Sequence, residues 1–86
     1  MLSHNVVIGN PNTGVAISGG FVTAQNNIIS GNGTLGIDVS TAKNALIITN
    51  NTALANGTLD LRDAVLGCGA VWSGNTFFTA NQSCIH

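Results

Sequence analysis

An internal repeat with a fixed period is the sequence feature that most constrains the fold of this chain. Asn5 to Ser18 reads NVVIGNPNTGVAIS and Asn27 to Ser40 reads NIISGNGTLGIDVS, and the two segments align without a gap. Every aligned pair has the same offset of 22, as Asn5 and Asn27 have (27 − 5 = 22). A fixed period of this kind indicates repeated units that cannot bury an apolar face alone and that form a core when stacked.

Short β-branched runs between Gly- and Asn-rich turns predict strands within each repeat. The repeats are expected at about 5–25, 26–44 and 45–63, with an irregular last turn and cap over 64–86. In the third repeat, Ile48 is aligned on Ile29 (48 − 29 = 19) and Leu59 on Ile37 (59 − 37 = 22). This alignment predicts a longer turn at residues 52–57.

The superposed repeats form columns of similar residues. Three columns are apolar and one is asparagine: Val7, Ile29, Ile48 and Phe78; Val15, Ile37 and Leu59; Ile17, Val39 and Leu61; and Asn10, Asn32, Asn51 and Asn81. Stacked apolar columns predict a continuous core, and stacked asparagine amides can hydrogen-bond along the stack. The predicted fold is all-β: a single domain, 1–86, that forms a short right-handed parallel β-helix of about four turns with an irregular C-terminal cap.

The signatures I-x-G-N and G-I-x-V-S at this period resemble the right-handed parallel β-helix repeat family, which is related in fold to the pectate lyases. The end of the chain, WSGNTF (72–77) and TANQSCI (79–85), looks like the closing turn of secreted members. The resemblance implies the C-terminal part of a secreted or surface protein. A flat sheet face with few charges could bind polysaccharide or other chains. Met1-Leu2-Ser3 does not begin as a signal peptide begins.

Charge is scarce in this sequence, with two basic and three acidic residues in 86. A nucleic-acid partner requires clustered Lys and Arg, so this class is not expected. No apolar run reaches the length of a membrane span. His4 and His86 lie at opposite ends without a third ligand at metal-site spacing, so no metal site is predicted.

Cys68 and Cys84 are the only cysteines. A disulfide between them is favoured over two buried free thiols, and it would indicate an oxidising compartment. Trp72, the only tryptophan, is a candidate for stacking on a sugar ring, although a tryptophan in a capping loop more often covers the end of a core.

Asp38, Asp60 and Arg62 are the candidate catalytic residues. In the alignment above, the two aspartates occupy the same place in successive turns and point outward, with Arg62 on the same face. Two neighbouring carboxylates could act as acid and base on a glycoside or bind Ca²⁺. The enzymes of the resembled fold use Ca²⁺-binding acids and a basic residue on such a face. A polar face neutralised by Arg62 is the plainer interpretation, and it is preferred.

The favoured function is a non-catalytic β-helix module with a structural or polysaccharide-binding role and no cofactor. The alternative is a small polysaccharide lyase or glycoside hydrolase that uses Asp38, Asp60 and Arg62, that could require Ca²⁺, and that is completed by oligomerisation. The first turn has no turn above it in the sequence, so exposed strand edges are expected there. They predict a homo-oligomer joined through turn ends or edges, located outside the cell or on its surface.

Overall fold

Residues 1–18, 22–40 and 46–86 are described by the structure, a computed structural model. The sequence also favours a short strand at Phe21-Val22 and a lone turn charge at Lys43, and Phe21 and Lys43 lie outside the described residues. The strands are β1 (Leu2–Ser3), β2 (Val6–Ile8), β3 (Val15–Ile17), β4 (Val22–Gln25), β5 (Ile28–Ser30), β6 (Leu35–Val39), β7 (Leu46–Thr49), β8 (Thr52–Leu54), β9 (Leu59–Asp63), β10 (Val71–Ser73) and β11 (Thr76–Phe77). No helix in the described part of the chain is long and apolar enough to cross a membrane.

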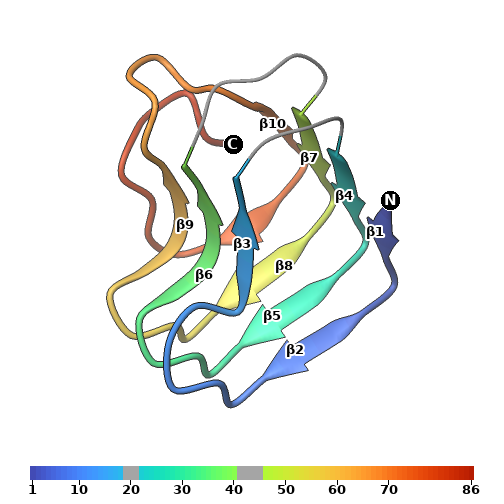
Figure 1. Ribbon diagram of the computed structural model, residues 1–86, viewed down its shortest axis with the longest axis vertical. Helices are drawn as coiled ribbons and strands as arrows, with labels where there is room; N and C mark the ends of the chain where they lie inside the picture. The colour runs from blue at the N-terminus through green and yellow to red at the C-terminus, as the bar shows by residue number, and fades with distance from the viewer. Residues whose placement is uncertain (19–21, 41–45) are drawn as a thin grey trace.

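The strands form three parallel sheets, each of which receives one strand from every turn of the chain. Sheet A has the order β1-β4-β7-β10, sheet B β11-β8-β5-β2, and sheet C β3-β6-β9. Figure 1 shows the strands of each sheet side by side, with β1, β2 and β3 together at one end of the coil. The prediction of an all-β parallel solenoid of about four turns is therefore confirmed.

The register shows where the period changes. Val7 lies opposite Ile29 at an offset of 22 (29 − 7), and Ile29 lies opposite Ala53 at an offset of 24 (53 − 29). The alignment of Ile48 on Ile29 is wrong, because Ile48 lies in sheet A opposite Ala24. Only two strands per repeat stand out in most of the sequence, whereas each full turn has three. The alignment therefore matched a sheet A strand, β7, to a sheet B strand, β5, and began the third repeat one strand too early.

The predicted lengthening of the turn at residues 52–57, by three residues (22 − 19 = 3), is wrong, because the offset is 24 both before that turn, at Thr52, and after it, at Leu59. Ile17 lies opposite Val39 at an offset of 22, and Val22 lies opposite Leu46 at an offset of 24. The increase therefore falls between Val39 and Leu46. One consequence is that Leu61, not Leu59, stacks on Ile37.

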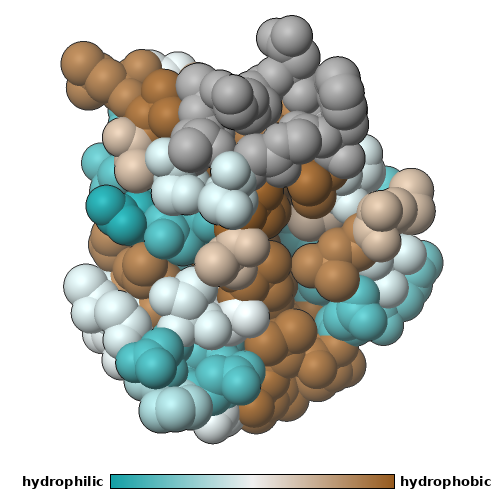
Figure 2. Space-filling model, viewed as in Figure 1, coloured by the Kyte–Doolittle hydropathy of each residue, from teal (hydrophilic) through white to brown (hydrophobic). Residues whose placement is uncertain are grey.

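The core is a column of inward-facing side chains from all three sheets. Its buried members are Ile17, Ala24, Ile29, Ile37, Val39, Leu46, Ile48, Ala53, Leu61, Ala70, Trp72 and Ile85. The outer surface also carries apolar side chains, and five of them gather on or beside sheet B: Val6, Ile8, Ile28, Leu54 and Phe78. Figure 2 shows hydrophobic surface over β2 and β5.

Two corners of the coil, the one between sheets A and B and the one between sheets B and C, share one backbone feature. The residue before each stacked asparagine has a positive φ: His4, Asn26, Asn50 and Gly74 at one corner, and Gly9, Gly31 and Ala55 at the next. This left-handed conformation favours glycine and tolerates asparagine. It turns the chain sharply, and the asparagine that follows it is brought inside the corner.

Residues 64–86 close the far end of the coil. The structure joins Cys68 to Cys84 in a disulfide, and Ile85 returns to the core. Ala80 forms a bridge to Leu61 at an offset of only 19 (80 − 61), so the last turn is shorter than the others.

Candidate functional site

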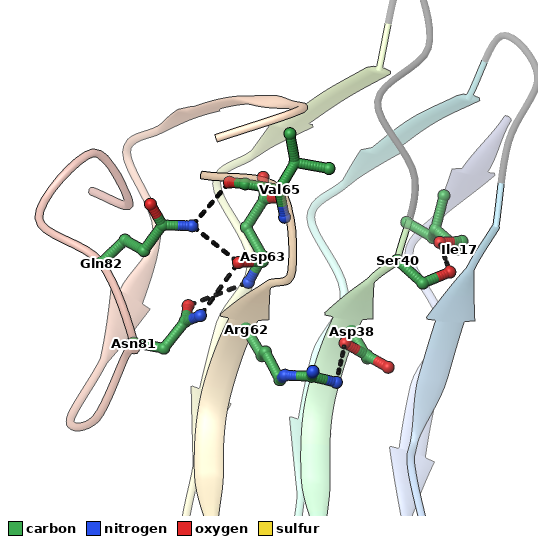
Figure 3. A network of polar contacts seen from close by, with 8 residues as sticks. All are labelled: Ile17, Asp38, Ser40, Arg62, Asp63, Val65, Asn81 and Gln82. Atoms are coloured by element: carbon green, nitrogen blue, oxygen red, sulfur yellow. Dashed lines mark hydrogen bonds and ion pairs between the residues drawn. The ribbon is translucent and has the colours of Figure 1, made fainter. Parts of the chain in front are cut away.

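Asp38 and Arg62 are direct neighbours on the outer face of sheet C. Their Cα atoms are register partners, and Arg62 Nη1 lies 3.2 Å from Asp38 Oδ1 (Figure 3). The Asp38 side chain is 18% exposed and the Arg62 side chain is 42% exposed. The pair is a partly solvated ion pair, in which the guanidinium neutralises the carboxylate.

Asp60 does not join this pair. It is buried, and its Oδ1 accepts hydrogen bonds from Asn56 N and Asn56 Nδ2, each at 3.0 Å. Its Oδ2 accepts hydrogen bonds from Phe78 N at 2.9 Å and Thr79 N at 3.2 Å. The predicted pairing of Asp38 with Asp60 is wrong, because the offset of 24 between β6 and β9 places Arg62 opposite Asp38.

The electrostatics of Asp60 suit a structural acceptor. Burial raises the pKa of Asp60, but the hydrogen bonds from Asn56, Phe78 and Thr79 outweigh burial and hold the pKa below its ordinary value. A general acid at neutral pH requires a raised pKa, so the lowered pKa of Asp60 does not suit the role of general acid in glycoside cleavage.

Trp72 is inside the coil and only 2% exposed. It lies opposite Ile48 in sheet A, and its Nε1 donates a hydrogen bond to Asp63 Oδ2 at 3.0 Å. Its ring faces are packed in the core and do not reach a sugar in solvent. The tryptophan covers the end of the core, which is the more usual role of a tryptophan in a capping loop.

Asp63 was not among the candidates predicted from the sequence. It is fully buried, and its Oδ1 accepts a hydrogen bond from Val65 N at 3.0 Å. Its Oδ2 accepts hydrogen bonds from Gly69 N at 2.9 Å, Ala70 N at 3.1 Å and Trp72 Nε1. Burial raises the pKa of Asp63, but these four hydrogen bonds outweigh burial and lower the pKa below its ordinary value.

The backbone of Asp63 is held as well. Asp63 N donates to Asn81 Oδ1, while Asp63 O accepts from Asn81 Nδ2 and from Gln82 Nε2 (Figure 3). Gln82 Nε2 also donates to Val65 O at 2.7 Å. One residue therefore fastens both the loop after β9 and the C-terminal segment. A sequence signal existed: an acid falls where the alternation of β9 calls for an inward side chain.

Two asparagine ladders run along the coil, one at each of two neighbouring corners. The first ladder, between sheets A and B, consists of Asn5, Asn27, Asn51 and Asn75, and the second ladder, between sheets B and C, consists of Asn10, Asn32 and Asn56. Within each ladder, the backbone N–H and the Nδ2 of one asparagine both donate to the Oδ1 of the next, over 2.9–3.2 Å.

The single predicted column merged these two ladders. Asn10 and Asn32 belong together, but Asn51 lies in the first ladder, and Asn81 lies beside Asp63. Both corners have the same local chemistry, a left-handed residue followed by asparagine, so sequence similarity alone did not separate them.

The two ends of the ladders differ. At the C-terminal end, Asn75 Nδ2 donates to His86 O at 3.0 Å, and Asn56 donates to Asp60 Oδ1, so oxygen atoms of other residues take the place of a further asparagine. At the N-terminal end, Asn5 Oδ1 and Asn10 Oδ1 accept no hydrogen bond from the residues that the structure describes. Within residues 1–18, 22–40 and 46–86, the ladders are therefore closed at one end and open at the other.

Neither a concave pocket nor a group of side chains able to hold a metal ion occurs among residues 1–18, 22–40 and 46–86. Comparisons of the chain with family models, with curated proteins and with solved structures found no match. The distinctive features of the described surface are therefore the two unlike ends of the coil and the apolar outer side of sheet B.

Proposed function

We propose that this chain is a non-catalytic β-helix module with a structural role: it closes one end of a stack of β-helix turns. The observation that carries the proposal is the difference between the two ends of the ladders. A repeat array needs end units unlike its interior units, because an uncovered turn exposes core and strand edges. Asp60 and His86 end the two ladders, and residues 64–86 cover the core.

The proposed location of the module is outside the cell or on its surface. The disulfide between Cys68 and Cys84 supports this part of the proposal, because such bonds persist in oxidising compartments. The two cysteines are separated by 16 positions in the sequence. In the chain-entropy description, a disulfide that closes a loop of about that length stabilises a chain by roughly 3 kcal/mol.

The enzymatic alternative receives no support from the site. Asp38 is paired with Arg62, and Asp60 is buried and saturated with donors. Trp72, the residue expected to stack on a sugar ring, offers no platform for a polysaccharide, since it is buried. A structural role is therefore the function that the geometry favours.

Opening the cap tests the proposal. The variant Cys68→Ala/Cys84→Ala/Asp63→Asn removes the disulfide and weakens the Asp63 clasp, which is the set of hydrogen bonds that the Asp63 carboxylate accepts from Val65, Gly69, Ala70 and Trp72. Light scattering coupled to size-exclusion chromatography is then performed over a range of concentrations. We expect the variant to form elongated, concentration-dependent species, because an uncovered end can pair with the open end of another molecule. We expect the parent chain to form none of these species, because its cap is closed.

Circular dichroism provides the control for folding, and a milder opening uses reductant alone on the parent chain. If the triple variant and the reduced parent both keep their sheet signal and elute at the volume of the untreated parent, then opening the cap does not allow molecules to stack. The proposed function would then be wrong.

A further inference from the structure

In the part of the chain that the structure describes, the open end of the coil has hydrogen-bonding groups without partners and an incompletely covered core. The strands β1, β2 and β3 each have a sheet neighbour on one side only. Leu2, Val7 and Val15 pack against the core but are only partly buried. Asn5 and Asn10 hold the terminal Oδ1 acceptors of the two ladders. This end therefore has both an apolar surface and a defined polar pattern.

The direction of the ladders determines what can fit there. In every step, the earlier turn donates N–H and Nδ2 and the later turn accepts at Oδ1, as from Asn5 to Asn27. The occupant must therefore present donors to Asn5 and Asn10. The open end of a second copy presents the same acceptors, so oxygen would face oxygen. The closed end of a second copy has already directed Asn56 to Asp60 and Asn75 to His86.

The spacing of the two ladders defines the occupant further. The asparagines of a turn are five residues apart in each case: Asn5 and Asn10, Asn27 and Asn32, and Asn51 and Asn56. An inward apolar residue follows the first asparagine by two positions, as Val7, Ile29 and Ala53 do. A matching turn would carry the pattern Asn-x-apolar-x-x-Asn and run parallel to β2.

We propose that the open end is a binding site for one further turn of parallel β-coil that carries two asparagines five residues apart. This turn adds a parallel strand to β2, covers Val7, and donates its two Asn Nδ2 groups to Asn5 Oδ1 and Asn10 Oδ1. The mode is strand addition, in which main-chain hydrogen bonds provide affinity and the side-chain pattern provides specificity. The inference deepens the proposed function, since a module that closes one end of a stack receives the stack at its other end.

The test inserts a second copy of residues 5–26 ahead of Asn5, which keeps the period of the first two turns and leaves the cap intact. The matched control is the same insertion with its two ladder asparagines changed to aspartate, which keeps the shape and removes the Nδ2 donors. Urea unfolding and amide hydrogen exchange are measured for both variants and for the parent. We expect the asparagine insertion to lower the unfolding equilibrium constant about tenfold or more and to protect the amides of β2 and β3, with most of the gain lost in the aspartate control.

Equal effects of the two insertions, or no effect of either, would overturn the inference. A parent chain whose β2 and β3 amides become protected as its own concentration rises would also overturn it, because a second copy would then be the occupant. A synthetic peptide of residues 5–26, added to the isotope-labelled parent, is the second measurement. Chemical-shift changes confined to β1, β2 and β3, and absent with the aspartate peptide, are expected, and their absence with both peptides counts against the site.

The result is separable from the test of the cap. If the opened cap fails to produce elongated species but the insertion still discriminates asparagine from aspartate, the proposed function fails and this inference survives. The opposite pair of outcomes would keep the cap and remove the binding site.

Discussion

Asp63 occupies a position where the stack would otherwise continue with an aliphatic side chain. Ile17 and Val39 lie in the same column, and Asp63 is the register partner of Val39. A lone buried carboxylate is costly, but this one accepts four N–H groups, and so its desolvation is compensated. The apolar column therefore ends at Asp63, and backbone N–H groups of the cap donate hydrogen bonds to its carboxylate.

The variant Asp63→Asn tests this role. The new amide group points N–H at donors that previously met a carboxylate, so we expect the free energy of unfolding at pH 7 to fall by about 2–4 kcal/mol. Urea denaturation measures the change. The matched control is Asp38→Asn on the neighbouring strand, which loses only a partly exposed ion pair and should cost about 0–1 kcal/mol. Equal costs at the two sites would contradict the buried-clasp account.

The same carboxylates predict an acid-sensitive fold. The pKa values of Asp60 and Asp63 are lowered on folding, so the folded chain binds fewer protons than the unfolded chain in the acidic range. Their stabilisation is complete above the unfolded pKa of about 4 and is lost as the pH falls through that value toward the folded pKa. Thermal unfolding measured between pH 7 and pH 2 should show this decline. The decline should be shallower in Asp63→Asn, and an unchanged slope there would contradict it.

At the scale of elements, the corners between strands carry the polar order of the molecule. Asn27, Asn32, Asn51 and Asn56 each donate their backbone N–H to the next side-chain oxygen along the ladder, and their Nδ2 to that oxygen and to a carbonyl of an earlier turn. Asn51 Nδ2, for example, donates to Ala24 O at 3.0 Å. Buried polar groups arranged in this way specify a register, because a slip of one residue would leave every rung without a partner.

Asn51→Asp is the corresponding prediction. The substitution is isosteric, but it removes the Nδ2 donor to Ala24 O and Asn75 Oδ1 and places a charge at a buried site. We expect a loss of about 2–4 kcal/mol in the free energy of unfolding, measured by urea denaturation. Asn12→Asp, at an exposed position in the same kind of sequence, should change stability by less than about 0.5 kcal/mol. A small effect at position 51 would show that the ladder contributes little.

The sequence predicted the coil well and its third turn poorly. The first two turns repeat the same residue types at a constant offset, so Val7 on Ile29 and Val15 on Ile37 followed from the alignment. The prediction for the third turn was wrong because two added positions between Val39 and Leu46 changed the period. A second reason is that the two asparagine corners have similar sequences, so the alignment did not show which corner a segment forms. The predicted pairing of Asp38 with Asp60 depended on that alignment and is wrong for the same reason, since Arg62 is the register partner of Asp38. The alternation of β9 places Asp63 inside the coil, but the partners of Asp63 in residues 65–82 come from segments that no local pattern brings to it.

At the scale of the whole molecule, the coil is close to one-dimensional, because most contacts join a turn to the next one. In such a stack, stability is roughly a sum of units and of interfaces between neighbours, and a unit with one neighbour opens more readily than a unit with two. Sheet B illustrates this, since β5 lies between β2 and β8 whereas β2 has β5 alone. The closed end does not share the weakness of β2, since the disulfide and the Asp63 clasp hold it.

Native-state hydrogen exchange tests this gradient along the coil. We expect hydrogen-bonded amides of β2 and β3 to exchange at least about tenfold faster than those of β5 and β6, which corresponds to about 1.4 kcal/mol in the opening free energy. Reducing the disulfide should raise the exchange of residues 64–86 and leave the gradient between β2 and β5 unchanged, because the two ends are separated by the intervening turns. Uniform protection throughout the coil would mean that the molecule opens only as a whole. Slow exchange at β2 that becomes fast on dilution would mean instead that the open end is covered by self-association.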